Sequence, residues 1–290
     1  MRTKYQVIGL SSFTAALMIW AGACGDTSGT GDTAMTGTGG AGSSNGAGTG
    51  SSQSGGVGGD IFTGSGTVGV GVGSSSGAGG TQNCGNKLEA IVRDFQVAHP
   101  DFEDFLGNDL GIVHPDLGAD GKPMYAGNPT TPTTTGKDNF DQWFRDIAGT
   151  NIAIPIQIEL TPVGGGMYTY DNSAFFPIDG QGFGDEGNIH NYHFTLEMHT
   201  EFEYKGGEVF TFTGDDDLFT YINKKLAINL GGVHGAQSQT VDLDAMAAQL
   251  GIVKGNKYTL DFFFAERHTS ESNFRIDTTI GCFTPVPPPS

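Results

Sequence analysis

Apolar and polar side chains alternate with a period of two over most of residues 84–283. The alternation is clearest in segments 152–160, 192–198, 210–212, 226–230, 258–264 and 274–278. Turn-forming pairs of glycine, asparagine and lysine separate several of these segments, for example Gly231-Gly232 and Gly255-Asn256. The pattern is typical of antiparallel strands with one buried face. It predicts an all-β fold, and about 200 residues of such strands favour a β-sandwich.

Helical spacing occurs in two places. Phe140, Trp143, Phe144 and Ile147 recur at intervals of three and four, and a second short helix is expected over residues 242–250. The spacing favours Trp143 as a core residue over a platform that stacks on sugars. One or two short helices should therefore accompany the strands.

The N-terminal residues have a different composition. Arg2 and Lys4 precede an uncharged run that ends in Ala21-Gly22-Ala23, directly before Cys24. This arrangement resembles the signal peptide and lipobox of bacterial lipoproteins, which makes Cys24 the expected lipidation site. An ordinary signal peptide cut near Ala23 and an uncleaved anchor are alternatives, and all three export the remaining chain.

Residues 25–83 contain 22 glycines, mixed mainly with serine, threonine and alanine. Such a segment buries too little apolar surface to offset its ordering entropy, so it is expected to be a disordered tether. The predicted organisation is a lipoprotein signal peptide at 1–23, a lipidated cysteine and linker at 24–83, a β-sandwich at 84–284 and a proline-rich tail at 285–290.

The net charge of -18 limits the possible partners. An acidic surface repels both nucleic acid phosphates and anionic lipid head groups. Nucleic acid is therefore excluded as an expected partner, and membrane attachment is expected only through the lipid anchor.

Two cysteines remain after Cys24, and they bracket the foldable region. Cys84 and Cys282 form an even pair in an exported protein, which favours one disulfide. Two free thiols are the alternative, whereas the absence of nearby Cys or His partners argues against a metal site.

Three adjacent carboxylates are the clearest candidate for chemistry. Asp215, Asp216 and Asp217 follow one predicted strand and precede another. Their mutual repulsion is relieved if a cation binds them, and calcium prefers oxygen ligands of this kind. A solvated acidic turn is the alternative.

Several further motifs make the chain resemble a known family. They include Arg93-Asp94-Phe95, His99-Pro100-Asp101-Phe102, Thr134-Thr135-Gly136-Lys137, Phe175-Phe176-Pro177-Ile178-Asp179-Gly180, Gly214-Asp215-Asp216-Asp217, Gly231-Gly232-Val233-His234 and Ala265-Glu266-Arg267-His268. With them, residues 88–280 resemble the fibro-slime domain, a family similar to the PA14 domains of bacterial toxins, glycosidases and yeast adhesins. The resemblance implies a PA14-like β-sandwich and brings no catalytic activity with it.

The resemblance also implies a ligand site. In PA14 adhesins a paired Asp-Asp binds calcium, a second loop supplies an asparagine, and the sugar bridges to the metal. Asp215 and Asp216 match this pair, and Asn273 and Glu266 are the expected completing ligands.

Four neighbouring residues are expected to contact the ligand. Asp217, His234, Arg267 and His268 lie at or beside predicted strand ends, where binding residues often occur. A structural role is the alternative, with Arg267 paired to a carboxylate and His268 capping a turn.

These features favour a non-enzymatic surface lipoprotein, in the outer membrane or at the cell surface, that binds extracellular carbohydrate or matrix through calcium. A structural component of an envelope or slime matrix, without a small ligand, is the alternative. A glycoside hydrolase is less favoured, because Asp216 and Glu266 would have to flank an open cleft.

Overall fold

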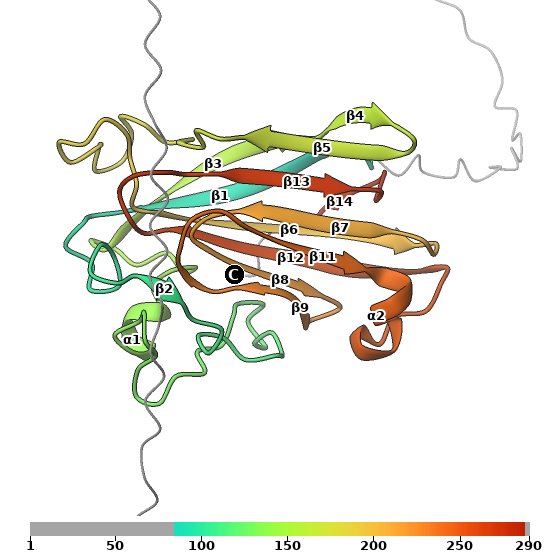
Figure 1. The fold of residues 1–290 in the computed structure, drawn as a ribbon, viewed down its shortest axis with the longest axis horizontal. Helices are drawn as coiled ribbons and strands as arrows, with labels where there is room; N and C mark the ends of the chain where they lie inside the picture. The colour runs from blue at the N-terminus through green and yellow to red at the C-terminus, as the bar shows by residue number, and fades with distance from the viewer. Residues whose placement is uncertain (1–83, 288–290) are drawn as a thin grey trace, which may run out of the picture. The chain divides into compact units, whose positions relative to one another are not determined.

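The computed structural model describes residues 84–287 (Figure 1). The predicted signal peptide, Cys24 and the linker to residue 83 lie outside the described residues, as do residues 288–290 of the predicted tail. Within residues 84–287, no helix has both the length and the apolar character needed to cross a membrane.

The larger sheet has seven antiparallel strands in the order β3-β1-β6-β12-β8-β9, with β14 paired to β6. Their bounds are β1 Lys87–Phe95, β3 Asn151–Glu159, β6 Phe194–Tyr204, β8 Asp217–Ile222, β9 Lys225–Leu230, β12 Asn256–Glu266 and β14 Thr284–Pro285.

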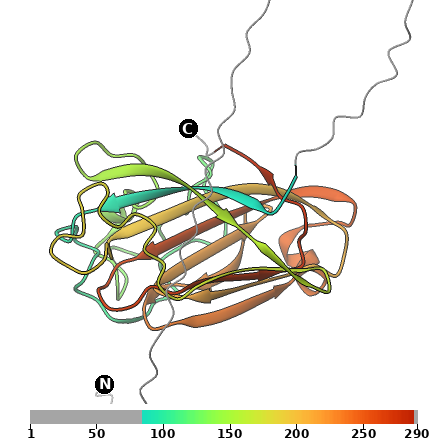
Figure 2. The same cartoon turned by 90° about the horizontal axis from the view of Figure 1, so that it is seen from above.

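The smaller sheet has five antiparallel strands in the order β11-β7-β13-β5-β4. Their bounds are β4 Thr161–Gly164, β5 Met167–Asn172, β7 Val209–Gly214, β11 Gln237–Asp242 and β13 Phe274–Thr278. Two short strands, β2 Gly107–Asn108 and β10 Gly232–Val233, pair with each other and with no strand of the two larger sheets. Figure 2 shows the strands from above.

The two sheets pack across one hydrophobic core. Phe212 of β7 and Phe274 of β13 meet Phe262 and Phe264 of β12, with ring centroids 5.2–6.1 Å apart. These four side chains are fully buried, as expected for the facing surfaces of two sheets. The prediction of an all-β sandwich is confirmed.

The central strands of the larger sheet are buried on both faces, so the prediction of a single buried face is wrong for them. Phe263 of β12 points away from the sandwich core into a second apolar cluster, where it meets Phe144 with ring centroids 5.0 Å apart. Phe140 and Trp143 belong to the same cluster and are also fully buried. The long segment between β2 and β3, drawn in green in Figure 1, thus covers the outer face.

The opposite discrepancy occurs at β3. The alternation predicts burial of every second residue from Ile152, yet Ile152 is 37% exposed and Ile154 and Ile156 are only partly buried. Ile158 and the following Leu160 are fully buried. Because β3 is the edge strand next to β1, most of its apolar face has fewer neighbours than a central strand.

The predicted helix at 242–250 is present as α2, Leu243–Leu250. The Asp242 side chain caps its first turn by accepting a hydrogen bond from the Ala245 N–H, and Gly251 ends it in the left-handed conformation. The other helix, α1, covers only Lys137–Phe140, so its predicted continuation to Ile147 is wrong. Turns replace it, while Trp143 still packs in the interior as expected.

A buried charge network lies on the outer face of the larger sheet. Arg93 Nη1 donates to Glu197 Oε2 at 2.7 Å, and Lys122 Nζ donates to the other Glu197 oxygen. His199 Nε2 lies 2.7 Å from Glu197 Oε1, and its Nδ1 lies 2.7 Å from Asp261 Oδ1. All five side chains are buried. Since Lys122 belongs to the covering segment, the network attaches that segment to the sheet.

The charges of this network shift its pKa values. Burial alone would raise the pKa of Glu197, but the His199 hydrogen bond and the charges of Arg93 and Lys122 lower it to about 2. Burial opposes the charge of His199 too, yet hydrogen bonds to Asp261 and Glu197 raise its pKa. The network therefore holds Glu197 firmly ionised.

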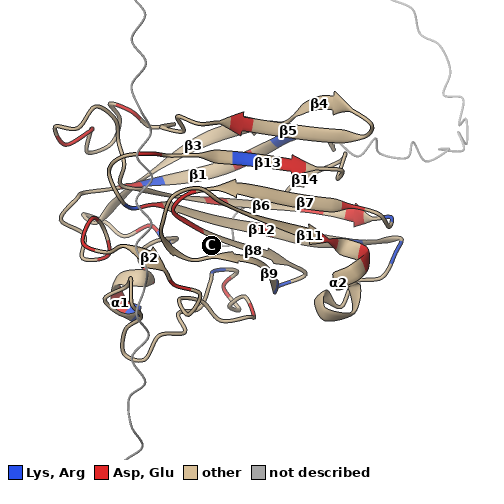
Figure 3. Ribbon diagram, viewed as in Figure 1, with Lys and Arg blue, Asp and Glu red and all other residues tan. Residues whose placement is uncertain are grey.

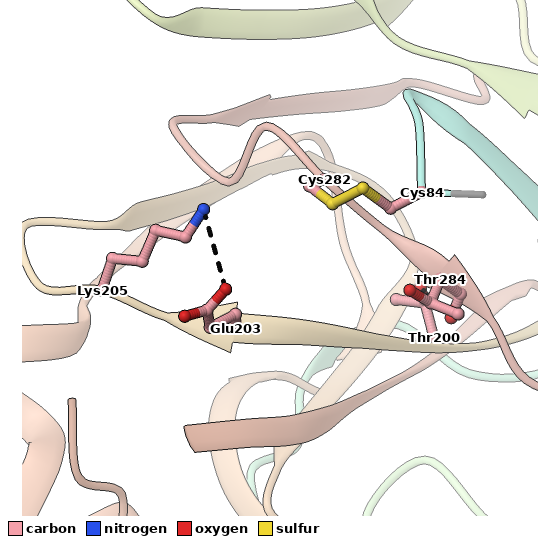
Figure 4. Close-up of a disulfide and its surroundings, with 6 residues drawn as sticks. All are labelled: Cys84, Thr200, Glu203, Lys205, Cys282 and Thr284. Atoms are coloured by element: carbon pink, nitrogen blue, oxygen red, sulfur yellow. Dashed lines mark hydrogen bonds and ion pairs between the residues drawn. A yellow bond between two sulfur atoms is a disulfide. The ribbon is translucent and has the colours of Figure 1, made fainter. Parts of the chain in front are cut away.

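The predicted disulfide joins Cys84 to Cys282, with the two Cα atoms 5.0 Å apart (Figure 4). Reciprocal backbone hydrogen bonds between Gly85 and Phe283 continue the connection. Nearby, Thr200 Oγ1 donates to the Thr284 carbonyl at 3.0 Å. The two ends of the sandwich sequence are thus held together, 198 residues apart in the chain.

Candidate functional site

Asp215 and Asp216 connect the two sheets at one end of the sandwich. β7 of the smaller sheet ends at Gly214, which is paired with Phe274, and β8 of the larger sheet begins at Asp217, which is paired with Ala265. The loop between β12 and β13 crosses between the sheets at this same end. The register therefore brings the β12–β13 loop, including Asn273, next to the aspartates, as the sequence predicts.

Asp215 is fixed by Asn273. The backbone N–H of Asn273 donates to one carboxylate oxygen at 2.6 Å, and its side-chain amide donates to the other at 2.9 Å. Asp215 and Asn273, which the sequence predicts to belong to one site, are therefore in direct contact.

Asp216 is held by two backbone N–H groups. The His234 N–H donates to Oδ1 and the Arg267 N–H donates to Oδ2, both at 3.1 Å. The peptide bond between Asp215 and Asp216 is cis. Both carboxylate oxygens of Asp216 are thus oriented by neighbouring loops.

Asp217 and Arg267 do not line the surface, although the sequence predicts that both contact a ligand. Each is 0% exposed, and Arg267 Nε donates to Asp217 Oδ2 at 2.5 Å. The guanidinium also donates to the carbonyls of Asp101 and Thr133 and lies 4.7 Å from the centre of the Trp143 ring. The structural alternative for Arg267, pairing with a carboxylate, is what the structure contains.

Three further acids at this end are buried without a cationic partner. Asp215, Asp216 and Glu266 are 3%, 6% and 1% exposed, and none of the ion pairs within residues 84–287 includes them. Burial and the charge of Asp217 raise the pKa of Asp216 to about 8. Burial also raises the pKa of Asp215, and burial together with Asp216 raises that of Glu266 well above its usual range. Glu266 Oε2 has no hydrogen-bond partner.

A pocket of about 140 Å³ opens beside the aspartate pair, which we call the carboxylate pocket. Asp215, Asp216, His234, His268 and Glu271 contribute to its wall. His234 Nε2 is buried without a hydrogen-bond partner. The two histidines predicted to contact a ligand, His234 and His268, therefore both lie on the wall of this pocket.

The wall of this pocket offers the carboxylate oxygens of Asp215, Asp216 and Glu271 together with the imidazoles of His234 and His268. No three His, Cys, Asp or Glu side chains of the described chain are arranged as a metal centre. This does not fit Glu266 as a third carboxylate ligand beside Asp215 and Asp216. The Asn273 amide nitrogen donates to Asp215, so only its side-chain oxygen could serve as a ligand, and backbone carbonyls can complete a calcium shell.

Asp216 and Glu266, the two acids that a glycoside hydrolase would need, do not line the same pocket. Asp216 lines the carboxylate pocket, whereas Glu266 is fully buried and does not line it. Two carboxyl groups must flank the scissile bond in that chemistry. The geometry does not favour the hydrolase alternative.

Acidic residues also occur in neighbouring loops at this end of both sheets, coloured red at the left of Figure 3. Glu271, which no sequence pattern marks, lies on the same loop as Asn273 and lines the pocket. Phe176 and His190 of the β5–β6 connection, whose rings stack on each other, were also not predicted to contact a ligand. Phe176 lies within a recognised motif, but its neighbours in space could not be inferred from that motif.

Comparison with known proteins places this fold. Residues 175–282, which belong to the β-sandwich described above, match the family model described as PA14 domain. Among proteins with curated descriptions, the chain is 40% identical over 205 residues to Protein psiD of Dictyostelium discoideum. That alignment covers 66% of this chain and 39% of psiD. It is 41% identical over 212 residues to Protein psiR of the same organism, covering 67% of this chain and 21% of psiR.

The chain therefore spans well under half the length of either relative. Among solved structures, the PA14 sugar-binding domain from an RTX adhesin aligns with 9% identity and a TM-score of 0.24. That alignment covers 42% of this chain and 75% of the adhesin domain.

Proposed function

We propose that the sandwich is a carbohydrate-binding module whose site is the carboxylate pocket and whose binding requires calcium. The observation that carries the proposal is the presence of Asp215 and Asp216, both buried and without a cationic partner, on the wall of a pocket. The match of residues 175–282 to the PA14 domain supports it. Export to the cell surface would place such a module within reach of an extracellular glycan or matrix polymer.

The charge balance supports a divalent cation. A buried ionised carboxylate is costly unless it is paired, and Arg267 is already committed to Asp217. Burial raises the pKa of both carboxyls, that of Asp216 to about 8, so calcium binding would release the Asp216 proton. Once ionised, Asp215 and Asp216 would carry two negative charges that a single calcium ion balances. When bound, the ion would supply positive charge and open coordination positions for sugar hydroxyls.

The neighbouring residues would keep these ligands in position. The Asn273 amide fixes the Asp215 carboxylate, and the His234 and Arg267 N–H groups fix that of Asp216. His234 and His268 would meet the sugar from the pocket wall. In this proposal Glu266 lies behind the site and supports the loop.

Calcium is expected to stabilise the protein, because a ligand that binds only the folded state stabilises it by mass action. The gain is about 2.7 kcal/mol at a hundredfold excess over Kd. The Asp216→Asn variant should lose this gain. In EGTA it should be no more stable than the wild type, because the amide cannot accept both of the backbone N–H bonds that Asp216 accepts, and the raised pKa of Asp216 already limits its repulsion of Asp215. Thermal unfolding with calcium and with EGTA measures both effects.

The control for this experiment is Asp138→Asn, which makes the same change at an exposed site on α1 and should keep the calcium response. Immobilised glycans probed with calcium and with EGTA test the sugar. A wild type that unfolds at the same temperature in calcium and EGTA, and retains no glycan, contradicts the proposal and favours the structural-matrix alternative.

We further propose that the chain is exported and lipid-anchored through Cys24. Expression of the full chain in a Gram-negative host, with an alkyne-labelled fatty acid, should label the protein and place it in the membrane fraction. Cys24→Ala should abolish the label and release the protein, whereas Thr27→Ala should change neither. Equal partitioning of the Cys24→Ala variant and the wild type is the result expected of an ordinary signal peptide.

A further inference from the structure

A second pocket adjoins the carboxylate pocket. It has a volume of about 340 Å³, and we call it the aromatic pocket. The two pockets share Ser270 and Glu271 as a common wall. Asn273 lines the aromatic pocket while its amide holds Asp215 in the other one. A ligand seated on the aspartates can therefore extend past Ser270 without crossing the protein interior.

A stacked pair of rings forms part of the aromatic pocket. Phe176 and His190 are parallel within 3°, with centroids 3.9 Å apart, and Tyr192 packs against Phe176 edge-on. His190 Nδ1 lies 2.6 Å from Asp179 Oδ2, and the other Asp179 oxygen accepts from the Asn191 N–H. The rings are thus held in a fixed orientation before any ligand arrives.

The most exposed apolar side chains gather at these two pockets. Within residues 84–287, Ile189 is 82% exposed and Leu106 is 76% exposed, the highest values among large hydrophobic residues. Ile189 lines the aromatic pocket and Leu106 lines the carboxylate pocket. Each of the two pockets therefore presents an exposed apolar side chain with which a ligand could make contact.

The mixture of groups indicates the class of that ligand. Serine hydroxyls and the Asn273 amide offer hydrogen bonds, while the rings and Ile189 offer apolar contact. A pyranose has this same combination of hydroxyl edges and C–H faces. The carboxylate pocket alone is smaller than the roughly 300–1,000 Å³ of typical small-ligand sites, and the two pockets together reach that range.

Charge restricts the class further. Glu271 is exposed on the shared wall, Asp179 supports the rings, and the chain carries a net charge of -18. Glycans rich in uronic acid or sulfate would be repelled from this surface.

We propose that the module binds a neutral oligosaccharide across both pockets, with one sugar at the aspartates and the next against Ile189 and the His190–Phe176 stack. This inference rests on the proposed function, since the first sugar occupies the calcium-dependent site. Ile189 and His190 then select for chain length.

The experiment uses the full chain in calcium and compares monosaccharides with their tetrasaccharides. The probes are glucose with cellotetraose and maltotetraose, mannose with mannotetraose, N-acetylglucosamine with chitotetraose, and tetragalacturonate as an anionic probe. We expect at least one neutral tetrasaccharide to bind ten times more tightly than its monosaccharide, which is about 1.4 kcal/mol. Ile189→Ser and His190→Ala should each remove most of that difference and leave monosaccharide affinity unchanged.

Val253→Ser is the matched control, because Val253 is 63% exposed and lines neither pocket. Variants that bind the tetrasaccharide as tightly as the wild type, or lose both probes equally, overturn the inference while calcium-dependent sugar binding stands. Stronger binding of tetragalacturonate overturns the neutral assignment. A wild type that binds no probe in calcium overturns the proposed function together with the inference.

Discussion

Replacing Glu197 with glutamine is expected to destabilise the fold by about 3–5 kcal/mol. The carboxylate is fully buried and receives hydrogen bonds from Arg93, Lys122 and His199. The amide keeps the shape of the side chain but leaves buried cations without their shared partner. Urea unfolding at neutral pH measures the difference, and it should also report early loss of the segment that contains Lys122.

Glu203→Gln is the matched control for this variant. It makes the same change on β6, where Glu203 is exposed and 3.8 Å from Lys205, and it should cost about 1 kcal/mol or less. The pH dependence follows from the pKa of Glu197, which is lowered to about 2 from 4.5. Its stabilising contribution is fully present above 4.5 and is lost as the pH falls through about 2. A gap between wild type and Glu197→Gln that does not shrink in acid argues against this account.

The second large effect is expected for Arg267→Met, again about 3–5 kcal/mol. Methionine fills much of the same volume but leaves the Asp217 carboxylate buried and unpaired, and it removes the donors to the Asp101 and Thr133 carbonyls. Adding Asp217→Asn to this variant should recover part of the loss, because the uncompensated charge is removed. Thermal and urea unfolding of both variants measure the recovery.

Arg275→Met provides the comparison at an exposed ion pair. Arg275 bridges Asp171 and Asp277 on the surface of the smaller sheet and should contribute about 1 kcal/mol or less. If Arg267→Met and Arg275→Met lower the free energy of unfolding equally, the buried Arg267–Asp217 pair stabilises the fold no more than an exposed ion pair does.

The sequence predicts the strands well because their alternation is a local property. β7 and β13 follow the apolar alternation of Phe210, Phe212, Phe274 and Ile276 closely. Burial of the outer face of β12 is not local, since it depends on Phe144 and Trp143 returning from more than 100 residues away. The unbroken run Phe262-Phe263-Phe264 was the available signal, because a strand buried on both faces shows no alternation.

The candidate site shows the same division. Asp215, Asp216 and Asn273 were predicted together because the resemblance to PA14 adhesins implies a paired Asp-Asp and an asparagine from a second loop, and the strand register places Asn273 in contact with Asp215. The roles of Asp217 and Arg267 could not be read from spacing, because the direction of the Asp217 side chain depends on where β8 begins and that of Arg267 on where β12 ends. Since β8 starts at Asp217, that carboxylate enters the interior while its neighbours stay at the pocket.

The position of the disulfide determines how the sandwich would carry a mechanical load. β1 ends at the candidate site, since Asp94 pairs with Phe194 and Phe194 pairs with Glu266, so Cys84 lies at the opposite end. Tension between residue 84 and a ligand on the aspartates would run along the strands. Hydrogen bonds from β1 to β3 and β6 would then be sheared together instead of being opened one at a time. Through Cys282 the same tension would also reach β14, so the pull would be shared between two strands that both pair with β6.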